Sequence, residues 1–326
     1  DPIMWDPFRY KLGGRLLNSE GDEFVQNYGH AETSDKYTAP RDLASLAILQ
    51  EVAAGRGSPA GGAYLSFEHI PEADLRAAFG PVIDRLAAND IDLTKRGIEV
   101  SPIAHYHMGG VRVDDHMETG VPGLFAAGEA VGGANGANRL SGNALSEAFV
   151  FGERAGRFAA AAIGDRVSSW SNKAARSAVD EIMAGRHVTT RQSGPSLASM
   201  LVTLQKIMWQ DVGLLRTANG LANARTLVQD MRWDIGDYPG ASDHRFALSM
   251  QEWFDLRNSL IAAEAIIAGA QTRTESRGAH QRGDFPRTDL DQTHNLITRL
   301  DGDGLRVMVA PLVSKPFELM PLEAAE

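Results

Sequence analysis

The sequence predicts a mixed α/β region, followed by an all-α region that ends in a β-hairpin. Short apolar segments separated by turns run from 98 to 131, a pattern typical of strands in an α/β sheet. Helical periodicity then continues from about 170 to 274. Two apolar segments flank Asp301-Gly302-Asp303-Gly304 near the end of the chain, and this turn-forming sequence predicts a closing hairpin.

Helix and strand are expected to alternate in the first part of the chain. Apolar residues at helical spacing predict a helix over 43–52, which Gly55 stops. A strand is expected over 63–70, and a second helix runs over 71–88, where a proline opens it.

Three strands and one long helix are expected in the next part of the chain. The strands cover 98–103, 110–114 and 123–127. A glycine-rich loop, 132–136, follows them and leads into a helix over 144–163.

The remaining periodicity is helical until the hairpin. Pro195 suits the first position of one helix, because its missing N–H has no partner there in any case. Residues 221–231 belong to a second helix, and residues 247–272 form a long third one with a broad apolar face.

The composition excludes several classes of function. With 43% hydrophobic and 23% charged residues, the chain is expected to be globular rather than disordered. A net charge of -10 argues against a general electrostatic grip on nucleic acid. Because there is no cysteine, the chain itself cannot form a thiolate zinc site or ligate an iron–sulfur cluster through cysteine. No apolar run approaches the roughly 20 residues that span a bilayer.

The most informative segment is 123–156, which reads as strand, glutamate, glycine-rich loop and helix. Glycines let a backbone approach a ligand closely, and the free N–H groups at a helix start face electronegative atoms. Glu129 follows the expected strand end, where α/β folds bind ligands and where a carboxylate can accept hydrogen bonds from sugar hydroxyls. On this physics alone, a plain structural turn is an equally good interpretation.

Four motifs occur in order along the chain. They are Pro40-Arg41-Asp42, His105-Tyr106-His107-Met108-Gly109-Gly110, the stretch from Gly123 to Leu145, and Glu275-Ser276-Arg277-Gly278-Ala279-His280. Together they resemble the flavoprotein subunit of succinate dehydrogenase and fumarate reductase, a family that includes L-aspartate oxidase and soluble fumarate reductases. The resemblance covers essentially all of the chain.

The resemblance implies a fold in three parts. These are a partial capping (substrate) domain over 1–95, the C-terminal part of an FAD-binding, Rossmann-like domain over 96–165, and a C-terminal helical domain with the closing hairpin over 166–326. FAD is the implied cofactor. By position, Glu129, Asn143, Ala144 and Leu145 would contact it, with the helix N-terminus stabilising negative charge on the reduced flavin.

The resemblance also implies a reaction, hydride transfer between flavin N5 and a carbon of a dicarboxylate. Arg41 would carry the proton, while His105 and Arg139 would bind the substrate carboxylates. Without the family, Arg41 reads as half of a surface pair with Asp42, and Arg139 as a residue that binds a phosphate or bonds to the backbone within its own loop. His107 is interpreted as a solvated loop side chain. A metal site at the two histidines lacks an evident third ligand.

The sequence departs from the family pattern at two places. Asp6-Pro7 stands where the family has a Thr–Glu pair, and Tyr10-Lys11-Leu12 replaces Arg-Gly-Glu. The proton relay therefore lacks its usual glutamate, and the substrate need not be succinate or fumarate. Asn135 replaces the histidine of the usual His-Gly-Ala-Asn-Arg.

No strand–GxGxxG–helix unit occurs in the sequence, although the family uses one to bind the ADP half of FAD. We therefore expect the C-terminal portion of a longer flavoprotein, inactive on its own, or a subunit completed by a separate FAD-binding chain. Two other functions stay open. One is a non-catalytic interaction or scaffold subunit, and the other is an L-aspartate oxidase-like enzyme.

The expected partners are a small dicarboxylate and an iron–sulfur or other electron-transfer subunit, with no nucleic acid and no direct membrane span. A cytoplasmic location is expected, with any membrane association made through partner subunits. Arg277, His280 and Arg282 form a compact basic group. The family has a similar motif, and we expect it to pack the helical domain onto the flavin domain.

Overall fold

The computed structural model describes residues 12–28, 40–165, 171–184, 195–236, 248–302 and 304–312. The chain divides into two compact units. The first unit contains Asp1–Gly110 and Ala127–Val150, and the second contains Val111–Ala126 and Phe151–Glu326. The division into three domains predicted from the sequence stays a prediction.

A three-stranded antiparallel sheet lies at the centre of the first unit. Its order is β1-β2-β3, with β1 at Arg15–Leu17, β2 at Ala63–Ser66 and β3 at Ile98–Val100. Leu65 pairs with Leu16 on one side and with Ile98 on the other. The strands at 63–70 and 98–103 are therefore confirmed, each over a shorter span.

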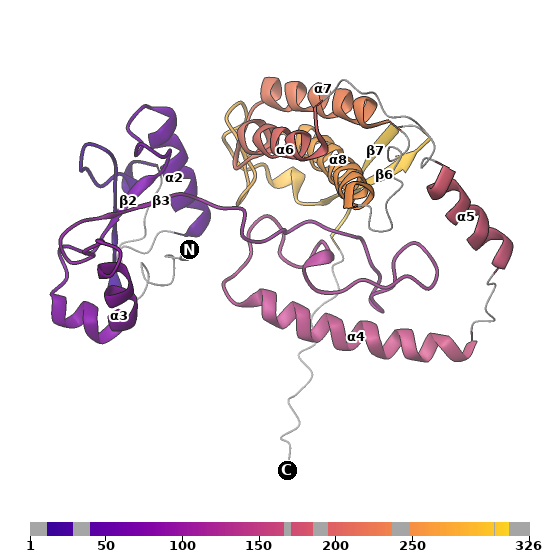
Figure 1. The fold of residues 1–326 in the computed structure, drawn as a ribbon, viewed down its shortest axis with the longest axis horizontal. Helices are drawn as coiled ribbons and strands as arrows, with labels where there is room; N and C mark the ends of the chain where they lie inside the picture. Colours follow the sequence, from indigo (N-terminus) through magenta and orange to yellow (C-terminus); the bar gives the residue numbers. More distant parts are fainter. Residues whose placement is uncertain are drawn as a thin grey trace, which may run out of the picture. The chain divides into compact units, whose positions relative to one another are not determined.

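Two helices share an apolar core with this sheet (Figure 1). They are α2 at Arg41–Ala53 and α3 at Glu72–Ala87, and both were expected from the periodicity. Pro81 lies inside α3 and cannot donate a backbone hydrogen bond, and the backbone leaves helical geometry at Phe79. The Phe79 ring nevertheless packs edge-on against Phe67, with the centroids 6.1 Å apart.

A buried carboxylate fastens the chain before α2 to that helix. Glu51 is 1% exposed and accepts hydrogen bonds from Arg56 at 2.7 and 2.8 Å and from Asn18 at 3.0 Å. The Tyr28 hydroxyl, at the end of the 3₁₀ turn η1 (Val25–Tyr28), also donates to it. The Arg56 hydrogen bonds lower the pKa of Glu51 to about 2, so this carboxylate is ionised and structural.

The strands expected over 110–114 and 123–127 are wrong. Among the described residues these segments form single bridges, such as Glu118 with Phe125, and no extended ladder. The Asp114 carboxylate accepts the backbone N–H groups of His116 and Glu118, each at 2.9 Å. Local side-chain bonding of this kind stabilises turns in competition with strand pairing.

One long helix, α4, follows the glycine-rich loop and runs over Asn143–Asp165. The loop is preceded by a short 3₁₀ turn, η2, at Gly128–Ala130. The helix predicted over 144–163 is thus confirmed, and the glycine-rich loop at 132–136 leads into it through residues 137–142.

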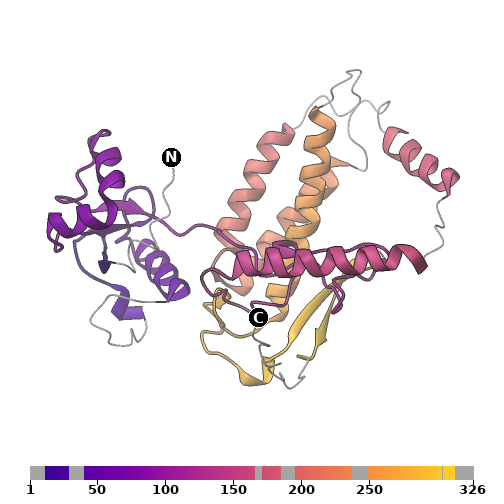
Figure 2. The same ribbon diagram turned by 90° about the horizontal axis from the view of Figure 1, so that it is seen from below.

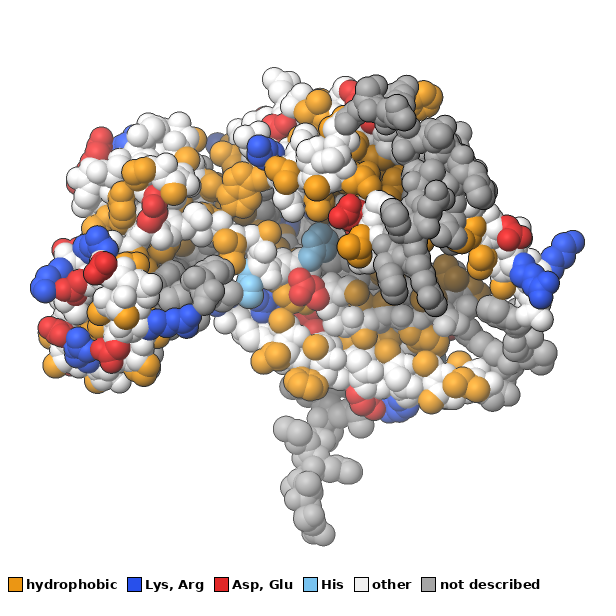
Figure 3. Space-filling view, viewed as in Figure 1, with side chains coloured by type: hydrophobic (Ala, Val, Ile, Leu, Met, Phe, Trp, Pro, Cys, Tyr) orange, Lys and Arg blue, Asp and Glu red, His pale blue; other side chains and the backbone are white. Residues whose placement is uncertain are grey.

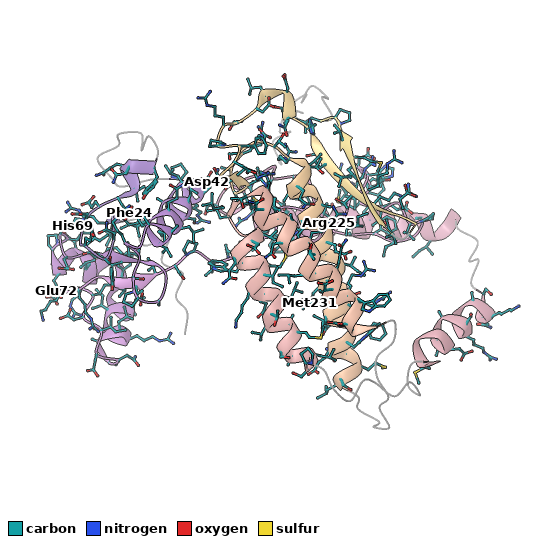
Figure 4. The ribbon with its side chains drawn as sticks, turned by 90° about the horizontal axis from the view of Figure 1, so that it is seen from above. Phe24, Asp42, His69, Glu72, Arg225 and Met231 are labelled. Atoms are coloured by element: carbon teal, nitrogen blue, oxygen red, sulfur yellow. The ribbon has the colours of Figure 1, made fainter. Side chains whose placement is uncertain are left out.

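Three antiparallel-packed helices form the core of the second unit (Figure 2). They are α6 at Leu197–Val212, α7 at Ala218–Ile235 and α8 at Leu248–Thr272. In α7 the buried positions follow a helical repeat of three and four residues and include Met231, which lies in the core (Figure 4). A shorter helix, α5, covers Asn172–Ala184.

The prediction for the start of α6 is wrong by two residues. Pro195 lies before the helix, and Ser196 is the N-cap, whose side chain accepts the Ser199 N–H. A hydroxyl at this position satisfies one of the free N–H groups of the first turn, so the serine rather than the proline sets the boundary.

Short strands complete the second unit. Leu215–Arg216 (β4) and Gln281–Arg282 (β5) pair in parallel. Asn295–Asp301 (β6) and Gly304–Ala310 (β7) form the antiparallel hairpin that the sequence predicts, preceded by the 3₁₀ turn η4 at Leu290–Gln292. The fold class, α/β elements followed by a helical region with a closing hairpin, is confirmed.

Candidate active site around the glycine-rich loop

The glycine-rich loop before α4 presents bare backbone. Gly133, Gly136 and Gly142 have φ values of +109°, +57° and +90°. Residues that carry a side chain rarely adopt this backbone conformation. No heavy atom lies within 4 Å of the place where a Cβ would stand on any of the three. The loop therefore has both the conformation and the open space that let a flat ligand approach its peptide groups.

The motif that begins at His105 packs against this loop, backbone to backbone. A Cβ on Gly110 would lie 2.4 Å from the Ala130 carbonyl oxygen, and one on Gly132 would lie 2.7 Å from the Gly110 nitrogen. Only glycines allow such an approach. Two motifs that are separate in the sequence thus form one structure in the first unit.

Glu129 lies in η2 and is exposed. Its Oε1 accepts the backbone N–H of His107 at 2.7 Å. This bond joins the two motifs a second time. It also gives His107 a contact through its backbone, while its side chain is exposed, as predicted for a loop residue.

Arg139 lies over the ring of Tyr106. The guanidinium carbon is 4.3 Å from the ring centroid, a cation–π distance. Nη1 donates to the Leu140 carbonyl at 3.1 Å, which is the loop bond that we considered as an alternative. Nε is buried and finds no acceptor among the described residues. His105 is exposed and directly precedes Tyr106, so the backbone that carries His105 passes beside Arg139.

Two polar partners of this cluster were not found from the sequence. The Tyr106 hydroxyl donates to Glu147 in α4, and the Asn135 amide donates to the other oxygen of Glu147 at 2.6 Å. Glu147 is 6% exposed. The available signal was a single acid among the small and apolar residues of the first two turns of α4.

Arg41 reaches the same loop. It begins α2, next to Asp42 (Figure 4), and its Nη2 donates to the Ser141 hydroxyl at 3.2 Å. Ser141 lies two residues after Arg139 and two before the start of α4. The structure therefore brings Arg41 to the segment that carries Arg139. Asp6, Pro7, Tyr10 and Lys11, which depart from the family pattern, lie outside the described residues.

The residues present fit the isoalloxazine end of FAD. A helix N-terminus follows bare backbone, and Asn143 and Ala144 in its first turn are partly exposed. Two large apolar side chains, Leu140 and Leu145, flank this N-terminus and are 74% and 68% exposed. Apolar side chains continue along α4 (Figure 3), a surface that suits contact with an aromatic ring system or with protein.

The basic group after α8 makes its bonds inside the second unit. Arg277 and Arg273 both pair with Glu275, at 2.9 and 2.7 Å. Arg282 is 3% exposed and binds the Asp284 carboxylate through two nitrogens, each at 2.8 Å. These bonds tie the segment after α8 together, which supports a structural role for the motif.

Comparisons with known proteins identify the chain. Two protein-family models match, "FAD binding domain" at residues 8–145 and "Fumarate reductase flavoprotein C-term" at residues 202–324. The fold, the loop and these matches define a flavoprotein whose cofactor is FAD. The chain belongs to the succinate dehydrogenase and fumarate reductase flavoprotein family.

Individual relatives agree with this placement. One of the subunits of the fumarate reductase (CoM/CoB) of Methanothermobacter marburgensis is 36% identical, covering 85% of this chain and 49% of that protein. The L-aspartate oxidase of Caulobacter vibrioides is 35% identical, covering 90% of this chain and 49% of that protein. A solved variant of the E. coli quinol fumarate reductase FrdA superposes with a TM-score of 0.83 at 27% identity, covering 96% of this chain and 57% of that one.

The chain spans about half the length of the curated relatives that it matches. Within the described residues, no helix combines the length and the apolar character needed to cross a membrane.

Proposed function

We propose that this chain supplies the substrate side of an FAD-dependent active site that interconverts a C–C single bond and a double bond in a dicarboxylate, as between succinate and fumarate. One observation carries the proposal. Arg41, Arg139 and the bare glycine loop meet directly before the N-terminus of α4, joined by the Arg41–Ser141 hydrogen bond. Membership of the family supplies the reaction class.

Glu129, Asn143, Ala144 and Leu145 are the proposed cofactor contacts. FAD, when bound, supplies the hydride donor or acceptor for the reaction. Glu129 offers an exposed carboxylate to hydroxyl groups. The N–H groups of the first turn of α4, at Asn143 to Leu145, stabilise negative charge on an acceptor atom placed before the helix.

His105 and Arg139 are the proposed ligands of the substrate carboxylates. A guanidinium offers two parallel N–H donors to a carboxylate, which fixes orientation as well as affinity. Stacking on Tyr106 uses none of these donors. The buried Nε of Arg139 has no acceptor among the described residues, and an arriving carboxylate would supply one.

Arg41 is the proposed proton carrier. Its guanidinium is too basic to act as an ordinary acid, so it needs a neighbouring acceptor and donor chain to give up a proton at Nη. Ser141, which accepts from Arg41 Nη2 at 3.2 Å, holds the side chain toward the loop that carries Arg139. A proton from this direction would reach the substrate carbon next to the one that receives the hydride.

An L-aspartate oxidase-like activity is the second candidate. A relative with that name is 35% identical over 90% of the chain, almost the same degree of similarity as the fumarate reductase relative. Both substrates are dicarboxylates, so the same arginine and histidine would bind either one. The difference lies at the reacting bond, which is C–C in one substrate and C–N in the other.

An electron-transfer subunit is the proposed partner. Since the chain contains no cysteine, an iron–sulfur cluster ligated by cysteines would belong to another chain. Electrons would then pass between that partner chain and the bound FAD.

The test is a comparison of two substrates with the FAD-loaded flavoprotein in which this chain is completed by the GxGxxG unit that its sequence lacks. Fumarate with a reduced viologen dye is expected to be turned over, and L-aspartate with an artificial electron acceptor is not. Turnover of L-aspartate alone would favour the second candidate. A protein that binds FAD but acts on neither substrate would support the scaffold function and contradict the proposal.

A further inference from the structure

We propose that Glu147 is a positioning residue that orients Arg139 through Tyr106, with Asn135 occupying the second oxygen of the Glu147 carboxylate. The inference rests on the proposed function, because it assigns a task to residues that lie behind the proposed substrate ligand Arg139. These three partners come from two loops and from α4.

The first step concerns the burial of Glu147. Its side chain is only 6% exposed, and a buried carboxylate needs hydrogen-bond donors at both oxygens. Tyr106 supplies a hydroxyl to one oxygen and Asn135 supplies an amide N–H to the other, at 2.6 Å. Both donors are neutral, whereas Glu51 also has one arginine and Glu275 has two arginines. Tyr106 and Asn135 therefore satisfy both oxygens of Glu147 with hydrogen bonds, and neither of them forms an ion pair with it.

The second step concerns the tyrosine ring. A phenol that donates to a carboxylate gains electron density in its ring, which strengthens its attraction for a cation over its face. The hydrogen bond to Glu147, with burial as a smaller cause, raises the pKa of Tyr106. The hydroxyl thus stays protonated and continues to donate throughout the neutral range. Glu147 thus affects Arg139 indirectly, through the Tyr106 ring that lies between them.

The third step concerns the N–H donors of Arg139, which its stacking contact with Tyr106 leaves available. Contact with the ring at 4.3 Å restricts the plane of the Arg139 guanidinium while leaving its N–H donors unused. One donor, Nη1, binds the Leu140 carbonyl at 3.1 Å. A guanidinium whose plane is set in advance loses less conformational freedom when a carboxylate binds.

Asn135 explains one departure from the family pattern. The usual residue at this place is histidine, and here its amide donates to Glu147. An amide does not titrate, so Asn135 offers its N–H at every pH, whereas a histidine would change charge near neutrality.

The experiment uses the FAD-loaded protein, the variants Glu147→Gln and Tyr106→Phe, and the double variant. Glu153→Gln is the matched control, because Glu153 lies on the same helix and is exposed. Malonate, a dicarboxylate with no double bond to reduce, is titrated while the flavin spectrum is followed. The KM and kcat for fumarate and the FAD content are measured in parallel.

Each single variant keeps the ring under Arg139 and should only weaken the cation–π contact. The malonate Kd is therefore expected to rise about threefold, a part of the contribution of such a contact, and the KM for fumarate to rise more than kcat falls. The double variant is expected to match the singles, because both substitutions interrupt one path. FAD content and the control variant are expected to stay at the wild-type level.

Three results would overturn the inference. An unchanged malonate Kd in Glu147→Gln or Tyr106→Phe would show that Glu147 does not act on Arg139 through Tyr106. Effects on the Kd that multiply in the double variant would show that the two residues have independent roles. Loss of FAD with normal malonate binding by the remaining holoprotein shows a merely structural residue. If Glu147→Gln does not fold, Tyr106→Phe alone decides. A wild-type protein that responds neither to malonate nor to fumarate instead contradicts the proposed function, and the inference falls with it.

Discussion

Two buried carboxylates, Glu275 in the second unit and Glu147 in the first, differ in the kind of hydrogen-bond donor that surrounds them. Glu275 is fully buried and has two arginines and a backbone N–H around it. Glu147 has only neutral donors in its recorded bonds, and the nearby cation Arg139 is stacked on a ring with a buried N–H left unpartnered among the described residues.

The difference distinguishes a structural network around Glu275 from the proposed binding site around Arg139. Both oxygens of Glu275 have donors within the chain. The buried Nε of Arg139 has no acceptor among the described residues, which is consistent with the proposed role of this residue in binding a ligand. The first kind of site should therefore respond to substitution in stability, and the second in binding.

The largest expected effect is at Glu275. Glu275→Gln leaves two arginines without their shared counter-charge in a buried place, which should reduce the free energy of unfolding by about 3–5 kcal/mol. Urea or thermal unfolding checks this. A loss below about 1 kcal/mol would mean that the network does not hold the second unit together.

Arg139→Gln should show the opposite behaviour. The loss of a charged, forked donor should weaken malonate binding about 100-fold, as expected for one or two charge-assisted hydrogen bonds. Stability should change by only about 1 kcal/mol, because the variant loses one exposed hydrogen bond to Leu140 and one cation–π contact with Tyr106, while the buried Nε has no partner to lose among the described residues. A large fall in stability with normal malonate affinity would place Arg139 in the structural class.

The free energy of unfolding should decrease in two pH ranges as the pH is lowered. Burial, helped by Arg216, lowers the pKa of His280 from 6.5 to about 4. Arg216 Nη1 lies 2.6 Å from Nδ1, and since an arginine only donates, Nδ1 accepts and the neutral ring carries its proton on Nε2. Below pH 6.5 His280 becomes protonated in the unfolded chain but not in the folded chain. The free energy of unfolding should therefore decrease as the pH drops from 6.5 to 4.

The fall should be at most about 1.4 kcal/mol per pH unit, and less because His280 is partly exposed. A second fall belongs to the carboxylates. Burial opposes ionisation of Glu275, but the hydrogen bonds from Arg277, Asp289 N–H and Arg273 outweigh it and lower the pKa to about 2, so this stability is lost as the pH drops from 4.5 toward 2.

Burial also lowers the pKa of His69, so this residue contributes to the same pH range as His280. The loss of stability between pH 6.5 and 4 should therefore be smaller in His280→Gln than in the wild type, and the loss between pH 4.5 and 2 unchanged. A loss of stability between pH 6.5 and 4 that is as large in this variant as in the wild type would exclude a contribution of His280.

The smallest effect is expected at the surface of the hairpin. Asp301 and Arg306 lie 3.7 Å apart, and about two thirds of each side chain is exposed. Asp301→Asn should change stability by less than about 0.5 kcal/mol, since exposed pairs contribute little. It serves as the control for Glu275→Gln, and a comparable loss in both would mean that burial is not what distinguishes them.

Much of this fold could be predicted from the sequence, for identifiable reasons. Helices α2, α3, α4, α7 and α8 have strong apolar periodicity, and the hairpin has an explicit turn sequence. The strands at 110–114 and 123–127 could not be judged correctly, because a strand depends on a neighbour that local sequence does not specify. The start of α6 depended on a single capping hydroxyl, Ser196.

The site was predictable in part. The motifs located the loop, Arg41 and Arg139, and the structure shows that these meet, while their roles stay predictions. Glu147 was missed because its contact with Tyr106 joins residues 41 positions apart. The stack of Arg139 on Tyr106 was missed for the same reason, since neither spacing nor periodicity specifies such a contact.

The central claim is that Arg41 acts on a dicarboxylate held at the loop before α4. The most direct measurement is the rate of fumarate reduction by the FAD-loaded protein and by its Arg41→Ala variant, with the exposed Arg76→Ala as the control. Removing a proton donor should lower turnover about 10²- to 10⁴-fold with FAD content unchanged. A wild-type rate in Arg41→Ala would contradict the account.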